Sequence, residues 1–356
     1  MTIIPFSAIV ATAMIPFPRY ALPLLTLLLL FHFPAESNPH PKYLLKLATL
    51  APEGSGWMKL WHQIQEEIEE KTEGQIKSQM YAGGVMGDDP DMVRKLRLGQ
   101  LDVVGATSLG AKLLVPEIAV FDLPFLFESW DEAEYVREQL RPYFAKLFDQ
   151  KGLVLIDWIH QGFVHINSKE PIRTAEDLAH QKVWAWSGEE IAIATLEALG
   201  IQPITTTVPE ALSALRTHLI TVIPTGSLAL LALQWFEEIN YITPLYMRYE
   251  LAVAAANKKA WNRMDPPLVK IIEKAFEEHR GELSDQIRKE NEFALQEMFR
   301  QGIKKVELTP AEREAFMKRT RPVWDQFAGK LYPRSLLNQI LKERETYRKN
   351  TQGSKN

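Results

Sequence analysis

The sequence predicts an α/β fold organised in two units, with one long helix that spans both of them. Short apolar runs alternate with helical patterns from residue 43 onward, which is typical of a mainly parallel sheet covered by helices. A second series of such runs begins near Gln161. Residues 265–301 keep an unbroken helical pattern that is too long for the edge of one compact domain. We therefore expect this helix to cross both units.

The first unit is predicted from a β-α-β-α-β run. Its strands are residues 43–50, 75–81 and 101–107, and its helices are residues 57–71 and 91–98. The first helix places Trp57, Leu60 and Ile64 on one face and polar side chains on the other. Asp88 or Asp89 is expected to cap the second helix. These elements indicate a sheet with helices on both faces.

The second unit continues the alternation. A further strand is predicted at residues 153–158, before this unit begins. The predicted strands of the second unit are residues 162–167, 182–186 and 201–207, and its predicted helices are residues 175–178, 189–199 and 209–217. Gly200 follows the second of these helices, at a position where glycine ends helices readily. The apolar residues 251–256 are expected to return the chain to the sheet of the first unit.

The N-terminal residues indicate export. Residues 21–33 form an apolar run of 13 residues, shorter than the roughly 20 that a membrane-spanning helix needs. The run lies between Arg19 and the Pro-Ala-Glu-Ser sequence of residues 34–37. This arrangement predicts a signal peptide over residues 1–37, cleaved near residues 35–38.

The same residues allow an uncleaved anchor as the alternative, and Met14 is a second possible translation start. The chain has no cysteine, which excludes a lipoprotein attachment and a disulfide framework. The predicted location is the periplasm.

Composition and motifs argue against several function classes. A net charge of −4 without a basic stripe makes nucleic acid an unfavourable partner. The eight histidines show no metal-ligand spacing, so no metal site is predicted. The sequence has no G-x-S-x-G, no H-E-x-x-H and no phosphate-binding glycine pattern. We therefore predict a protein that is not an enzyme and uses no cofactor.

Six sequence runs carry a resemblance to a known family. They are residues 47–57 (LATLAPEGSGW), 83–105, 121–127 (FDLPFLF), 167–186, 199–217 and 231–238 (LALQWFEE). In this order they resemble the DctP-type receptors of tripartite, ATP-independent (TRAP) transporters. The resemblance implies a two-lobed, periplasmic-binding-protein-like fold whose lobes close on one ligand and then dock onto TRAP membrane subunits.

On this resemblance, lobe I comprises residues 38–161 with 250–289, and lobe II comprises residues 162–249 with 290–345. Residues 346–356 are a polar tail. The run FDLPFLF is predicted to be a core segment on the hinge side rather than a part of the binding site.

The resemblance also exposes a departure from the family pattern. Where acid-binding members have an arginine, this chain has Val164, and where they have a second, salt-bridging arginine it has Trp184. The asparagine that completes their carboxylate site corresponds to Thr225. Neither valine nor indole replaces the paired charge-assisted bonds of a guanidinium. A free carboxylate is therefore disfavoured as the ligand.

Aromatic side chains are predicted to form the binding surface instead. Trp184 and Trp186 lie two residues apart, so on a strand both project from one face. We expect Trp184 to face the cleft more than Trp186 does, although an aromatic pair on a strand often belongs to a sheet core. Phe163 is expected to extend the surface from lobe II. Trp57, Tyr81 and Thr107 are expected to contribute from lobe I.

A subgroup of these receptors, whose transporters work with a tetratricopeptide-repeat (TPR) partner, is similar in carrying a tryptophan-bearing segment at this place. The resemblance implies a hydrophobic or lipid-like small-molecule ligand and a possible TPR-containing periplasmic partner. Two alternatives stay open. One is an organic acid held by other cations such as Arg173 or Arg216, and the other is an envelope scaffold or interaction module without a ligand.

Overall fold

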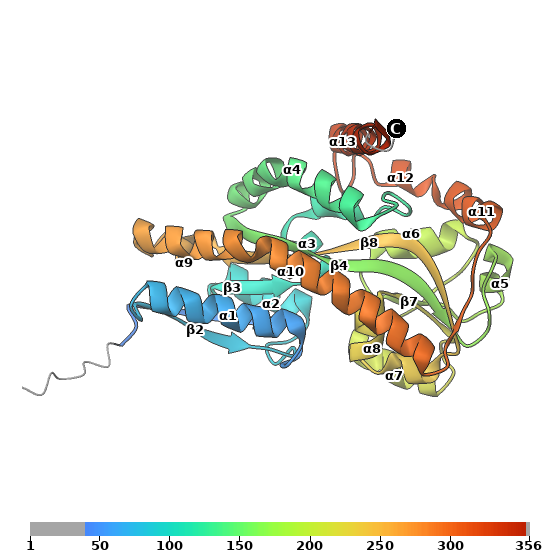
Figure 1. The fold of residues 1–356 in the computed structure, drawn as a ribbon, viewed down its shortest axis with the longest axis horizontal. Helices are drawn as coiled ribbons and strands as arrows, with labels where there is room; N and C mark the ends of the chain where they lie inside the picture. Colours follow the sequence, from blue (N-terminus) through green and yellow to red (C-terminus); the bar gives the residue numbers. More distant parts are fainter. Residues whose placement is uncertain (1–39, 354–356) are drawn as a thin grey trace, which may run out of the picture. The chain divides into compact units, whose positions relative to one another are not determined.

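The structure is a computed structural model that describes residues 40–353 (Figure 1). The predicted signal peptide lies outside this range. The strands are β1 (Tyr43–Thr49), β2 (Ile76–Tyr81), β3 (Val103–Ala106), β4 (Leu153–Ser168), β5 (Trp184–Trp186), β6 (Ile204–Thr206), β7 (Val222–Thr225), β8 (Tyr241–Asn257) and β9 (Lys304–Lys305).

The helices before β7 are α1 (Gly56–Lys71), α2 (Asp89–Arg97), α3 (Ser108–Leu114), the 3-10 helix η1 (Pro116–Asp122), α4 (Trp130–Gln150), α5 (Ala175–Ala179), α6 (Glu190–Ala198) and α7 (Val208–Arg216). Those after β7 are α8 (Ser227–Ala232), η2 (Trp235–Glu238), α9 (Lys258–Trp261), α10 (Pro266–Arg300), α11 (Pro310–Thr320), α12 (Val323–Gln326) and α13 (Arg334–Gly353). The last helix therefore extends well into the predicted polar tail.

The main sheet has the strand order β2-β1-β3-β8-β4-β7, with β9 beside β8. Strand β1 runs parallel to β2 and β3, whereas β8 runs antiparallel to β3 and β4. The sheet is mixed rather than mainly parallel, because β4 and β8 cross it in opposite directions. The short β5-β6 sheet joins it through a bridge between Val183 and Val222.

The two strands predicted at residues 153–158 and 162–167 are a single strand, β4. Its pairing with β8 shifts register at three places, one of them between His160 and Gly162. Gly162 has a φ of +130°, a backbone conformation that favours glycine, and here it lets the strand continue through an irregularity. The sequence prediction left a break over residues 159–161, which the structure shows as part of the strand.

Helices cover both faces of the first lobe, which is built on β1, β2 and β3. On one face, Trp61 and Ile64 of α1 pack with Phe276 of α10. On the other face, a second cluster includes Phe121 and Phe127, whose rings stack with centroids 6.3 Å apart. The prediction that FDLPFLF belongs to the core is confirmed for these two side chains.

Helix α10 spans both lobes, as the sequence pattern predicted. It packs against α1 at one end, against β4 in the middle and against α8 at the other end, and Figure 1 shows it crossing the molecule between them. Within residues 40–353, no helix has both the length and the apolar composition that a membrane span requires.

Candidate ligand-binding cavity

A cavity of about 790 Å³ lies between the two lobes, within the size range of small-molecule sites. The first lobe contributes loop segments that follow β1, β2 and β3, including residues 49–52, 83–84 and 105–108. The second lobe contributes β5, the start of α7, and the segment from the end of β7 through α8. Segments far apart in the chain therefore meet around one space.

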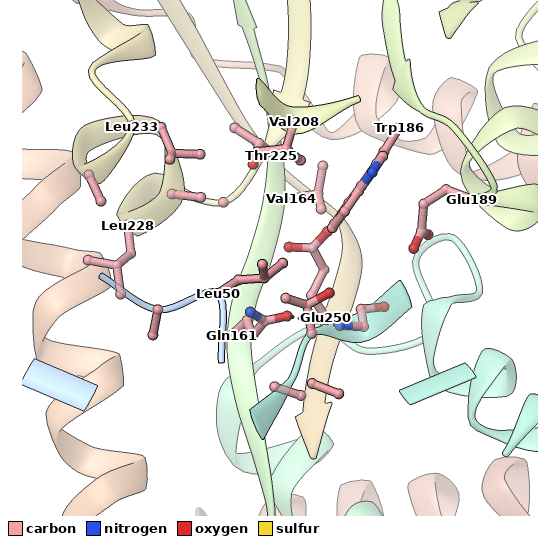
Figure 2. Close-up of a pocket in the computed structure, with 18 of the residues that line it drawn as sticks. Leu50, Gln161, Val164, Trp186, Glu189, Val208, Thr225, Leu228, Leu233 and Glu250 are labelled. Carbon is pink, nitrogen blue, oxygen red and sulfur yellow. Dashed lines mark hydrogen bonds between the residues drawn. The ribbon is translucent and has the colours of Figure 1, made fainter. Parts of the chain in front are cut away.

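Six of the eight predicted site residues line this cavity. They are Trp57 and Thr107 from the first lobe and Val164, Trp184, Trp186 and Thr225 from the second. Figure 2 shows Val164, Thr225 and Trp186 around the same space. The three positions that depart from the family pattern are thus brought together at one wall.

Phe163 and Tyr81 do not line the cavity. Because side chains of a strand alternate between its faces, Phe163 points away from the face that Val164 occupies. The Phe163 ring packs instead on Trp130 and Tyr249, with centroids 5.3 and 5.5 Å away. Tyr81 is partly buried against the hydrophobic core of the first lobe. Both side chains therefore contribute to packing in this structure.

The exposure of the two tryptophans of β5 is the reverse of the prediction, because Trp184 is the more buried of the two. Trp184 is only 5% exposed and packs edge-on against Trp235, with ring centroids 5.7 Å apart. Its indole N–H donates to Thr206 Oγ1 over 2.9 Å, so its polar atom is satisfied inside the protein. Trp186 also lines the cavity and is partly exposed. Both indoles thus add apolar surface to the cavity wall, and Trp186 is less covered by the protein itself than Trp184.

Most of the remaining wall is aliphatic. Leu50 lies on the first-lobe side, and Val208, Leu228 and Leu233 lie on the second-lobe side (Figure 2). Leu233 is 38% exposed. Covering such side chains with an apolar molecule releases water and stabilises the complex by about 25 cal/mol per Å² of buried area.

Five charged side chains form a cluster: Lys112 of α3, Asp122 of η1, Glu189 before α6, and Arg248 and Glu250 of β8. Glu189, Arg248 and Glu250 line the cavity, and Lys112 and Asp122 lie behind them. Lys112 Nζ pairs with Asp122 and lies 2.6 Å from Glu189 Oε2. Arg248 pairs with Glu189 Oε2 over 2.7 Å and with Glu250 Oε1 over 2.9 Å. We name this group the charged end of the cavity.

Burial and pairing set the protonation of the charged end. Burial would raise the pKa of Glu189, but the cations of Lys112 and Arg248 lower it to about 2. Burial raises the pKa values of Asp122 and Glu250 in spite of the same cations. Glu189 is therefore the ionised partner that bridges the two lobes, because it accepts from Lys112 of one lobe and Arg248 of the other.

Arg173 and Arg216, the alternative anion anchors, lie outside the cavity. Arg173 forms a two-pronged pair with Glu312 at 2.8 and 2.9 Å. Arg216 lies 3.5 Å from Glu238, and both arginines are more than 40% exposed. Neither side chain is placed to contact a ligand between the lobes.

Thr107 lines the cavity, but its hydroxyl is already engaged. It donates to the carboxylate of Asp89, which also accepts from the backbone N–H groups of Thr107 and Gly110. Asp89 therefore caps α3 rather than its own helix, while Asp88 caps α2. Burial raises the pKa of Asp89 to about 6. The hydroxyl and the backbone N–H of Thr107 are therefore both engaged within the protein.

No cluster of histidine and acidic side chains in residues 40–353 has the arrangement of a metal site. His160 lines the cavity, and its Nε2 lies 2.7 Å from Ser284 Oγ. Burial lowers the pKa of His160 to about 3, so this ring is neutral in the ordinary pH range.

Comparison with known proteins assigns the chain to a family. The model of bacterial extracellular solute-binding protein family 7, DctP, matches residues 47–330, which is well over half of the chain. The chain belongs to this family. Family 7 proteins are solute-binding receptors, so the prediction that the chain is not an enzyme is confirmed.

Individual family 7 proteins are distant in sequence. The C4-dicarboxylate-binding periplasmic protein DctP of Rhodobacter capsulatus is 26% identical over 286 residues, covering 79% of this chain and 84% of that protein. The TRAP periplasmic solute binding protein of Chromohalobacter salexigens, solved with bound D-glucuronate, is 21% identical with a TM-score of 0.78, covering 85% of this chain and 99% of that one. A Shewanella oneidensis structure with bound succinate is 18% identical with a TM-score of 0.79 and the same coverage. These structures confirm the two-lobed α/β fold.

The charged end is the part of the site that our reasoning from sequence missed. Lys112, Glu189 and Arg248 are ordinary charged residues in sequence and lie far apart in the chain. The one available signal was Asp122, an acidic residue inside the apolar run FDLPFLF, because a buried carboxylate requires cationic or hydrogen-bonding partners.

Proposed function

We propose that this family 7 receptor works in the periplasm, where it captures a hydrophobic or lipid-like small molecule and delivers it to a TRAP-type membrane transporter. The family match supports the receptor role, and the solved structures with this fold are TRAP periplasmic solute binding proteins. The chemistry of the ligand rests on the cavity itself.

One observation carries the ligand class. Among the described residues that line the cavity, Arg248 is the only lysine or arginine, and its guanidinium already pairs with Glu189 and Glu250. Val164 and Trp184 occupy the positions where the family resemblance implies arginines. A ligand carboxylate entering this space would have to break an existing buried pair, at a cost of several kcal/mol. An apolar ligand meets no such cost.

A second candidate is an organic acid bound at Arg248. The bound D-glucuronate and succinate of the two solved structures favour it, since those proteins share this fold. Arg248 is buried and lines the cavity, so a small anion that displaced Glu250 would find a guanidinium there. The alternative anchors Arg173 and Arg216 give this candidate no support.

The ligandless scaffold draws no support from the cavity, because about 790 Å³ remains between the lobes. A TPR-containing periplasmic partner stays a prediction that rests on the subgroup resemblance. In the transport model, closure follows from contacts that the ligand makes with both lobes, and Leu50 and Trp186 offer one apolar surface from each.

Native mass spectrometry of the protein purified from its own host, followed by solvent extraction, tests this proposal. We expect an apolar adduct that is lost in Trp186→Arg, because a charge placed on the wall weakens apolar binding more than about tenfold. Phe293→Arg is the matched control, since Phe293 is exposed on α10 and lies outside the cavity. A small organic acid as the only adduct, or no adduct at all, would overturn the proposal.

A further inference from the structure

Acidic side chains outnumber basic ones around the cavity. Lys112 and Arg248 face three carboxylates in the charged end, those of Asp122, Glu189 and Glu250, so the fully ionised cluster carries one excess negative charge. Two further acidic residues line the cavity, Asp88 and Glu290. His160 is neutral and supplies no compensating charge. The interior therefore has more acid than base.

Two carboxylates of the charged end have an oxygen without a hydrogen-bond donor among residues 40–353, those of Glu189 and Glu250. Glu250 is the more exposed of the two, at 20% against 3%. Its Oε1 accepts from Arg248, whereas its Oε2 has no protein hydrogen-bond donor among residues 40–353. Asp122 differs, because both its oxygens accept from Ser108 and it pairs with Lys112. The Glu250 side chain keeps 20% of its surface exposed and lines the cavity, as Figure 2 shows.

We propose that Glu250 receives the cationic, hydrogen-bond-donating end of an amphiphilic ligand, such as an alkylammonium group, while the apolar part lies against Trp186 and the aliphatic wall. This inference rests on the proposed function, since it requires an apolar ligand. An ammonium supplies both the missing positive charge and a donor for Glu250 Oε2. A hydroxyl supplies the donor alone, and a carboxylate supplies neither.

Three probes with one chain and different heads test the inference: dodecylammonium, dodecanol and dodecanoate, each titrated calorimetrically into ligand-stripped full-length protein below its aggregation limit. We expect dodecylammonium to bind at least about tenfold more tightly than dodecanol, and dodecanoate to bind more weakly than both. Equal affinities for dodecylammonium and dodecanol would overturn the inference.

The variant Glu250→Gln isolates the charge. Glutamine keeps an acceptor for Arg248, and the remaining cluster has two acids and two bases. We expect dodecylammonium affinity to fall at least about tenfold and dodecanol affinity to change less than about threefold. Glu273→Gln, an exposed acid on α10, is the matched control and should change neither. An unchanged dodecylammonium affinity in Glu250→Gln would contradict the inference.

The pH dependence of the wild-type protein gives a second measurement that needs no variant. Asp88, Glu189, Glu250, Glu290 and His160 face the cavity. Burial raises the pKa of Glu250, so acidification protonates it early. Dodecylammonium affinity should fall from about pH 8 to about pH 4 while dodecanol affinity changes less; equal changes would contradict the inference.

The probes separate the two proposals. Binding of dodecanol with no preference for dodecylammonium refutes the cationic head and leaves the apolar receptor in place. Failure of dodecanol and dodecylammonium to bind refutes both.

Discussion

The apolar wall and the charged end of the cavity are built in different ways. The wall comes from a few compact segments, β5, α7 and α8, whose side chains share a face and pack into one cluster with Trp184 and Trp235. The charged end comes from α3, η1, the start of α6 and β8, and it crosses between the lobes through Lys112 and Glu189. The wall supplies area for a ligand, whereas the charged end neutralises its own cations and leaves acid in excess.

The largest expected effect comes from removing the cation that joins the lobes. Lys112→Met leaves the fully buried Asp122 with the hydrogen bonds from Ser108 and with Arg248, 3.8 Å away, as its nearest cation. We expect the free energy of unfolding to fall by about 3–5 kcal/mol, as when one partner of a buried pair is removed. Urea denaturation measures the loss.

Lys274→Met is the matched control, because Lys274 pairs with Glu278 on the exposed face of α10 and its loss should leave unfolding unchanged. A loss below about 1 kcal/mol for Lys112→Met would show that the charged end does not hold the lobes together.

The next largest effect is a difference in stability between variants of the two tryptophans of the apolar wall. Trp184→Ala should lower the free energy of unfolding by about 3 kcal/mol, since it removes a core ring and its hydrogen bond to Thr206. Trp186→Ala should lower stability by less than about 1 kcal/mol but weaken dodecanol binding more than about tenfold. Equal stability losses in urea denaturation would contradict the assignment of Trp184 to the core.

Trp184 and Trp186 also show which features of the site could be predicted from the sequence. Period-two alternation and the family resemblance place Trp184, Trp186, Val164 and Thr225 at one wall. They do not say which indole is covered, because that depends on Trp235, about fifty residues further along the chain. The prediction for Phe163 was wrong because Phe163 is adjacent to Val164 on β4, and adjacent side chains of a strand lie on opposite faces.

More of the fold than of the site could be predicted from the sequence. The alternation of runs and the long pattern at residues 265–301 predicted the α/β class and α10, since periodicity is a local property. The continuous course of β4 and the antiparallel direction of β8 depend on pairing across the sheet. The charged end depends on contacts such as that between Lys112 and Glu189, 77 residues apart, which no local pattern encodes.

A smaller change in stability is expected from the ionisation of Asp89, whose carboxylate accepts from the cavity-lining Thr107. Burial raises the pKa of Asp89 to about 6, above its unfolded value, so its protonated form stabilises the fold at low pH. That contribution is lost as the pH rises from about 4 to about 6, by up to about 3 kcal/mol. Relative to Asp89→Asn, the wild-type protein should lose stability over this window in urea denaturation. A difference that does not change with pH would contradict the buried carboxyl.

The smallest effect is expected at the surface arginines. Arg173→Ala and Arg216→Ala remove exposed ion pairs outside the cavity, so ligand affinity measured by calorimetry should be unchanged. A loss of binding in either variant would move the ligand site away from the space between the lobes.

The most direct test of the account is calorimetric titration of ligand-stripped protein with succinate and D-glucuronate, with dodecanol as the reference. Because Arg248 is already paired and no other lysine or arginine among the described residues lines the cavity, we predict acid affinities weaker than about 1 mM and tighter binding of dodecanol. Micromolar binding of either acid, with no binding of dodecanol, would contradict it.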